Sequence, residues 1–135
     1  MTLPVFLKLY AVALPTFLAI DLLWLGVIAR AFYRAQLSHL MRADVNWIAA
    51  GAFYVVFVVG IVILSIGPAI ERRSARRAML LGALLGLVTY AAFDLTSLAV
   101  LEGFPLGMAV VDMMWGAVLC GAVSGITYRV WVRLT

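Results

Sequence analysis

The chain has 135 residues, of which 67% are hydrophobic and 12% are charged. A soluble domain is about half apolar and about a quarter charged, and a small domain leaves much of its surface exposed to water. The composition therefore excludes a soluble globular domain and indicates a membrane protein. The formal net charge of +4 fits Lys and Arg that flank membrane spans and meet anionic headgroups. Nucleic acid is not an expected partner, because no basic patch with interleaved aromatic residues is present.

Four apolar segments are long enough to cross a bilayer, which requires about 20 largely apolar residues. We expect spanning helices over residues 4–29, 47–67, 78–101 and 107–130. The first apolar run exceeds the ~7–15 residues of a signal-peptide core, so we interpret it as a retained helix. The predicted fold class is all-α: a polytopic membrane protein with four transmembrane helices in a compact bundle, forming a single domain over residues 1–135.

The connections between these segments are short. Residues 30–46 mix aromatic, aliphatic and basic side chains, which predicts an amphipathic helix lying along the lipid headgroups. Residues 68–77 form a basic loop, and residues 102–106 form a tight turn that contains Gly103 and Pro105. His39, the only histidine, falls in the first connection and is interpreted as a surface residue rather than a catalytic one.

The distribution of Lys and Arg near the helix ends predicts the orientation. One side of the membrane would hold seven basic residues: Lys8, Arg72, Arg73, Arg76, Arg77, Arg129 and Arg133. The other side would hold three: Arg30, Arg34 and Arg42. We therefore expect both termini to be cytoplasmic. The four arginines of the middle loop, Arg72, Arg73, Arg76 and Arg77, are the predicted topology determinants.

Three aspartates, Asp21, Asp94 and Asp112, interrupt the predicted spans. Ionisable side chains are costly in hydrocarbon, and they usually face a bundle interior or a cavity. At ~1.5 Å of rise per residue, each aspartate lies roughly 10–14 Å from the same, non-cytoplasmic end of its helix. We therefore predict that the three converge on one internal site. At least one of them should be protonated unless a cation lies among them, and Arg30 or Arg34 could supply that cation by reaching inward.

Helical spacing directs two of these aspartates inward. On the third segment, residues recur every four positions: Gly82, Gly86, Tyr90 and Asp94. The fourth segment has the same spacing: Asp112, Gly116, Cys120, Ser124 and Tyr128. Glycine at this spacing lets helix backbones approach closely, so both stripes are predicted to be interior faces. Two tryptophans, Trp24 and Trp115, lie near aspartates in the sequence and either wall a pocket or only fill the core.

Two interpretations of the aspartates remain open. Each could hydrogen-bond locally to Tyr90, Thr96, Ser97 or a tryptophan N–H and so tie helices together. Alternatively they form a ligand, ion or catalytic site, for which the candidate ligand-binding residues are Asp21, Asp94, Asp112, Trp24, Tyr90, Trp115 and Ser97. The single cysteine, Cys120, is interpreted as a small buried hydrophobe. With one cysteine and one histidine, no metal site and no cofactor are expected.

The segments around the aspartates carry a family resemblance. Residues 20–26 (IDLLWLG), 93–99 (FDLTSLA) and 111–116 (VDMMWG) resemble signature stretches of a bacterial inner-membrane family catalogued as domain of unknown function 2177. Tyr33-Arg34 through Leu40 and Phe53-Tyr54 also fit its pattern, so the resemblance covers nearly the whole chain. It implies a compact four-helix protein of the bacterial inner membrane without an established activity. Its members often accompany enzymes that modify unsaturated fatty acyl chains, and asparagine is commoner where this chain has Ser97, a shorter partner for Asp94.

Three functions are compatible with these features, and the sequence does not decide whether the protein is an enzyme. The first is binding or modification of a lipid or lipophilic small molecule at the three-aspartate site, with Trp24, Tyr90 and Trp115 as walls. The second is an accessory subunit that forms a homo- or hetero-oligomer through its glycine-rich helix faces. The third is a proton or cation pathway, for which Ser124, Thr127 and Tyr128 offer only a thin polar continuation.

Overall fold

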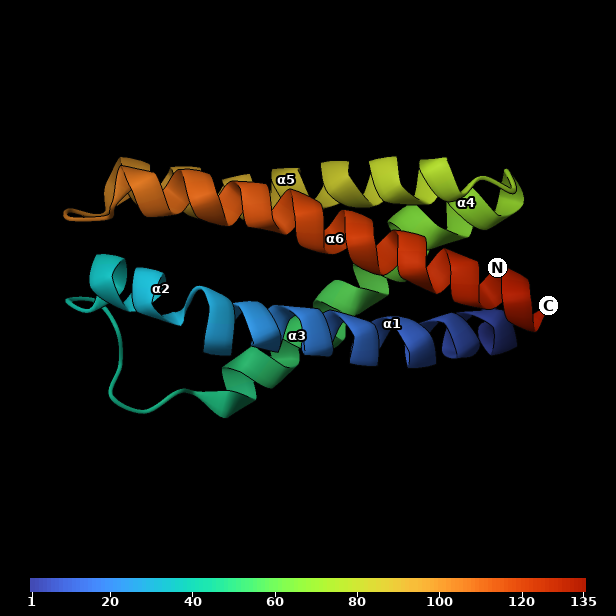
Figure 1. The fold of residues 1–135 in the computed structure, drawn as a ribbon, viewed down its shortest axis with the longest axis horizontal. Helices are drawn as coiled ribbons and strands as arrows, with labels where there is room; N and C mark the ends of the chain where they lie inside the picture. The colour runs from blue at the N-terminus through green and yellow to red at the C-terminus, as the bar shows by residue number, and fades with distance from the viewer.

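The structure, a computed structural model, describes residues 1–135. It consists of helices joined by short connections (Figure 1): α1 Leu3–Leu23, η1 Trp24–Ile28, α2 Arg30–Leu37, α3 Trp47–Ile61, η2 Val62–Ile66, α4 Gly67–Glu71, α5 Ala75–Val100 and α6 Leu106–Leu134. The π-helical segments η1 and η2 continue the helices before them. Four continuous helices are thus long and apolar enough to cross a membrane: Leu3–Ile28, Trp47–Glu71, Ala75–Val100 and Leu106–Leu134. The predicted all-α, four-span bundle is confirmed.

The helix ends follow from local capping. The side chain of Ser74 accepts a hydrogen bond from the backbone N–H of Arg77 over 3.0 Å and begins α5 three residues earlier than predicted. The second span continues to Glu71 rather than ending at Gly67. Pro68 lies in the first turn of α4, where proline is compatible with helical backbone. The predicted loop over residues 68–77 is therefore shorter and begins after Glu71.

The prediction of an interfacial helix over residues 30–46 was wrong beyond Leu37. Helix α2 ends at Leu37. It runs in the same general direction as α1 and does not turn across the end of the bundle (Figure 1). Asn46 has an extended backbone, and its side chain accepts from the N–H of Ala49 over 3.1 Å. Because Asn46 caps α3, it cannot also belong to a preceding helix. Tyr33 on α2 is buried and points toward the bundle interior.

Glycines bring α5 and α6 into close contact. A Cβ atom on Gly86 would collide with the carbonyl oxygen of Gly116, and a Cβ on Gly82 would collide with that of Cys120. A Cβ on Gly116 would collide with the ring of Tyr90. Both stripes are therefore interior faces, as predicted. These glycines are used for packing within the chain.

The core lies between α1, α6 and the α3–η2 helix. It is formed by ten buried residues: Leu9, Ala13, Phe17, Val58, Ile61, Val62, Ile66, Leu119, Cys120 and Val123. Within it, the hydroxyl of Ser65 hydrogen-bonds that of Ser124 over 2.9 Å and joins η2 to α6. Figure 1 shows α3 running obliquely, so that η2 and α4 lie beside α5 while the Trp47 end of α3 is far from it. This divergence leaves room for a pocket between α3 and α5.

Candidate functional site

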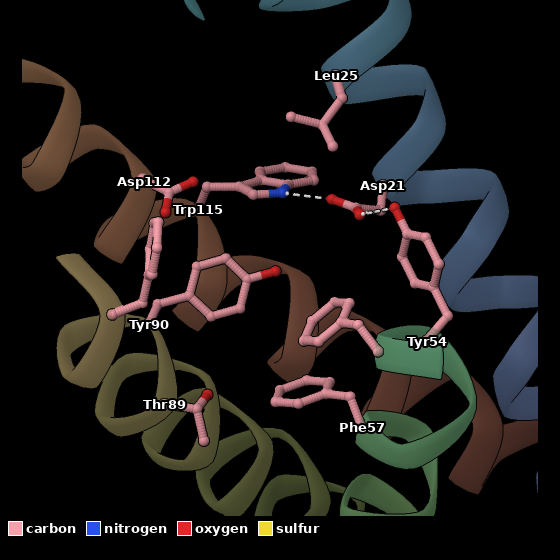
Figure 2. Close-up of a pocket in the computed structure, with 10 residues that line it drawn as sticks. Asp21, Leu25, Tyr54, Phe57, Thr89, Tyr90, Asp112 and Trp115 are labelled. Atoms are coloured by element: carbon pink, nitrogen blue, oxygen red, sulfur yellow. Dashed lines mark hydrogen bonds between the residues drawn. The ribbon is translucent and has the colours of Figure 1, made fainter. Parts of the chain in front are cut away.

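A pocket of about 480 Å³ lies where the four spans diverge (Figure 2). Every span contributes to its lining: Asp21 and Leu25 from the first, Phe53, Tyr54 and Phe57 from the second, Thr89, Tyr90 and Phe93 from the third, and Asp112 and Trp115 from the fourth. Six of these ten residues are aromatic and two are acidic, and none is basic. The pocket therefore combines an apolar wall with two carboxyl groups.

Asp21 on α1 is buried and held by donors from two other spans. The hydroxyl of Tyr54 donates to Oδ2 over 2.8 Å, and the indole N–H of Trp115 donates to Oδ1 over 3.1 Å. Figure 2 shows both bonds converging on Asp21 from opposite sides. Each carboxyl oxygen thus accepts one hydrogen bond, and α1, α3 and α6 meet at this side chain.

Asp112 on α6 ends a second chain of hydrogen bonds. The hydroxyl of Tyr33 donates to its Oδ1 over 2.8 Å, and the indole N–H of Trp24 donates to the same hydroxyl over 3.2 Å. Tyr33 is held in place by the apolar contacts of Phe104 and Met108. Helix α2 therefore directs a phenol to the pocket carboxyl.

The two hydrogen-bond chains meet through stacked indoles. The rings of Trp24 and Trp115 have centroids 4.3 Å apart and planes inclined by 9°. Trp24 begins η1, where the wider π-helical turn changes which side chains face inward. The same turn places Leu25 at the rim of the pocket. A π-helical turn directly after Asp21 is consistent with a functional site, since such turns often occur at them.

Asp94 on α5 lies outside the pocket lining, beside Asp112. It is fully buried, and no N–H or O–H donor reaches either of its oxygens. Its nearest polar partner is the carboxyl group of Asp112. Asp94 is therefore a buried carboxyl group next to a lining residue rather than a part of the lining.

The pocket opens toward the outer surface of the helices. Three of its lining residues are exposed: Leu25, Phe53 and Phe93, at 39%, 43% and 59%. Around them the outer surface carries large apolar side chains such as Leu84, Val88 and Val56. A surface of this kind contacts lipid in a membrane protein, so the opening faces the region of the acyl chains.

The structure brings together most of the predicted site residues. Asp21, Tyr90, Asp112 and Trp115 line the pocket. Trp24 stacks behind Trp115, and Asp94 contacts Asp112 without lining the pocket. Ser97 is buried on α5 but makes no side-chain contact with the pocket. Among the hydrogen-bond partners expected for the aspartates, only a tryptophan N–H, that of Trp115, donates to one of them. The hydroxyl of Thr96 donates to the backbone of its own helix instead. Arg30 and Arg34 are exposed and do not reach inward.

Sequence reasoning missed the two phenols that contact the aspartates. Tyr33 and Tyr54 were noted only as parts of the family pattern, and that pattern was the one available signal for them. The remaining pocket residues that were missed are apolar or small: Leu25, Phe53, Phe57, Thr89 and Phe93. In a chain with seven phenylalanines and five tyrosines, composition alone does not distinguish the aromatic residues of a pocket from those of the core.

Comparison with known proteins identifies a family but no characterised relative. A family model described as "Predicted membrane protein (DUF2177)" matches residues 6–129. No curated protein matches the chain. No solved structure matches it either. The matched region includes the second and third spans, most of the first and fourth, and every residue that lines the pocket.

Proposed function

Because the chain belongs to the DUF2177 family of predicted membrane proteins, whose description gives no activity, we propose a function from the pocket: it binds a lipophilic molecule that enters from the bilayer. The observation that carries this proposal is the aromatic pocket of about 480 Å³, which contains two carboxyl groups and has Phe53 and Phe93 among its exposed lining residues. Small-molecule sites are typically concave, mostly apolar and equipped with a few placed polar groups.

The arrangement of the lining supports this proposal. Phe53, Phe57 and Phe93 offer apolar surface near the opening, whereas Asp21 and Asp112 lie deeper, among their hydrogen-bond donors. An amphiphile would place its polar end against the carboxyl groups and leave its apolar end toward the lipid. Carboxyl groups are costly in hydrocarbon. A gap left only by imperfect helix packing would therefore not need two of them in its lining.

Native mass spectrometry of the purified protein tests the proposal. Thr89→Trp places a large side chain in the pocket, since Thr89 lines it. Val88→Trp is the matched control, because Val88 is the adjacent residue, is 57% exposed and lies outside the lining. We expect wild type and Val88→Trp to retain a co-purified molecule of lipid-like mass, and Thr89→Trp to lose it. Equal retention by all three proteins, or no bound molecule in any of them, would contradict the proposal.

We further propose that the protein lies in the bacterial inner membrane with both termini in the cytoplasm. The support is the excess of basic residues at the end of the bundle that holds the termini and the connection between α4 and α5 (Figure 1). Arg76→Cys and Glu102→Cys test the orientation, because the native Cys120 is buried and will not react. A membrane-impermeant maleimide should label position 102, and not position 76, from outside cells with a permeabilised outer membrane. The reverse pattern would overturn the orientation.

A further inference from the structure

We propose that the polar end of the ligand is an organic cation, an amine or quaternary ammonium group attached to an alkyl tail. This inference rests on the proposed binding function and names the chemical class that the pocket would select. It follows from two features that are independent of each other: the charge of the lining and the faces of its aromatic rings.

The lining carries acidic groups without any basic residue to balance them. Asp21 and Asp112 line the pocket, no Lys or Arg does, and the nearest candidates, Arg30 and Arg34, are exposed. Tyr54 and Trp115 each donate to Asp21, so these bonds hold its carboxyl group in place at the pocket. A cation in the pocket would meet two carboxyl groups and no competing basic side chain. An anionic headgroup would be repelled by the same carboxyl groups.

The aromatic side chains surround the space between the two carboxyl groups. Figure 2 shows Asp21 and Asp112 on opposite sides of the pocket, with the rings of Tyr54, Phe57, Tyr90 and Trp115 around the space between and below them. The face of an aromatic ring attracts a cation within about 6 Å of its centre, and quaternary ammonium groups are recognised by cages of such rings. A neutral alkyl chain would need neither the carboxyl groups nor this concentration of rings.

The shape of the pocket places the tail of the ligand. Phe53 and Phe93 at the opening are partly exposed, so an alkyl chain can leave between α3 and α5 into the region of the acyl chains. The cationic group would remain inside, near the hydroxyl of Tyr90, which points toward the middle of the pocket (Figure 2). Two kinds of molecule share this chemistry: a free lipophilic amine and a lipid with a choline or ethanolamine headgroup.

Calorimetric titration of the full-length protein in neutral maltoside micelles tests the inference, with empty micelles subtracted. The probes share a dodecyl tail and differ only in the headgroup: trimethylammonium, hydroxyl, sulfate and phosphocholine. We expect the trimethylammonium compound to bind at least about tenfold more tightly than the alcohol, and the sulfate to show the weakest binding. Phosphocholine binding as tight as that of trimethylammonium would assign a lipid headgroup, and weaker binding would assign a free cation; either result agrees with the inference.

Variants assign the preference to the pocket. Asp21→Asn should reduce the preference for trimethylammonium over alcohol to about unity, and Asp44→Asn, an exposed aspartate outside the pocket, should leave it unchanged. If Asp21→Asn does not fold, Phe57→Leu serves instead, because it removes one ring and keeps both carboxyl groups; the preference should then fall by about threefold. Equal binding of trimethylammonium and alcohol would overturn the cation inference and leave the proposed function standing. Absence of binding by every probe would overturn both.

Discussion

The indole N–H of Trp115 on α6 donates a 3.1 Å hydrogen bond to Asp21 on α1, across 94 positions of the chain. The same indole stacks on Trp24, whose own N–H donates to Tyr33. Trp115 therefore joins the two carboxyl groups of the pocket through one rigid aromatic unit.

Trp115→Phe removes the hydrogen bond to Asp21 and keeps an aromatic ring. Interhelical hydrogen bonds in membrane proteins contribute about 0.6–2 kcal/mol, so we expect the free energy of unfolding to fall by about 1 kcal/mol. Reversible unfolding in mixed SDS micelles measures this difference. Trp47→Phe is the control, since Trp47 is 71% exposed and should change stability little. An equal loss in the two variants would mean that the bond to Asp21 contributes nothing.

Gly86→Ala should separate α5 from α6. The added methyl group would collide with the backbone of Gly116, which has no flexible side chain to move. Overpacking typically costs about 1–3 kcal/mol, and we expect a loss at or above the upper end of this range in the same unfolding assay. Gly51→Ala is the matched control, because a Cβ there meets nothing within 4 Å. Tolerance of alanine at position 86 would refute the close contact.

Asp94→Asn should preserve or raise stability. In the wild-type protein no donor reaches the oxygens of Asp94, and its neighbour is the carboxyl of Asp112. An asparagine amide brings N–H donors that can reach Asp112, and a net hydrogen bond is worth about 1 kcal/mol. Asp94→Leu should lose stability instead, since it leaves Asp112 with one partner fewer. If Asp94→Asn unfolds as readily as Asp94→Leu, Asp94 has a partner that this account omits.

The hydroxyl of Tyr33 should remain protonated at a pH of about 10, at which exposed phenols ionise. Burial, followed in importance by the neighbouring carboxyl of Asp112, raises the pKa of Tyr33 above its ordinary value of about 10. Above that pH the unfolded chain releases the phenol proton and the folded protein keeps it, so the stabilisation from Tyr33 is complete below pH ~10 and is lost as pH rises further. The stability difference between wild type and Tyr33→Phe should therefore narrow in alkali. A phenolate absorbance assigned to Tyr33 at about pH 10 would contradict this.

The helical spans and their inward faces could be predicted because lipid imposes simple rules on sequence. The length of the apolar segments predicted the four spans. The four-residue spacing through Gly86 and Gly116 predicted that these residues lie on interior faces, which meet between α5 and α6. The shared depth of the aspartates predicted one site for all three; Asp21 and Asp112 line the same pocket, and Asp94 does not line it. Each of these predictions depends only on helix geometry and on the cost of polar groups in hydrocarbon.

The partners of the aspartates could not be predicted in the same way. Which residues meet Asp21 depends on the oblique path of α3, and this path is what brings Tyr54 to the carboxyl group. The position of Tyr33 depends on the π-helical turn η1, because the wider turn changes the direction in which the following side chains point. The start of the next helix depends on Asn46, whose side chain caps α3. These are properties of packing and capping between segments, which the periodicity of a single segment does not contain.

Photo-crosslinking in lipid nanodiscs can show whether the pocket holds a lipophilic ligand. A dodecyl trimethylammonium probe with a diazirine in its tail is activated, and the labelled residues are located by mass spectrometry. We expect labels on the exposed lining residues Phe53 and Phe93 that disappear in Thr89→Trp and persist in Val88→Trp. Labels confined to the outer surface, for example on Leu84, or pocket labels undiminished by Thr89→Trp, would contradict the claim that this pocket holds a lipophilic ligand.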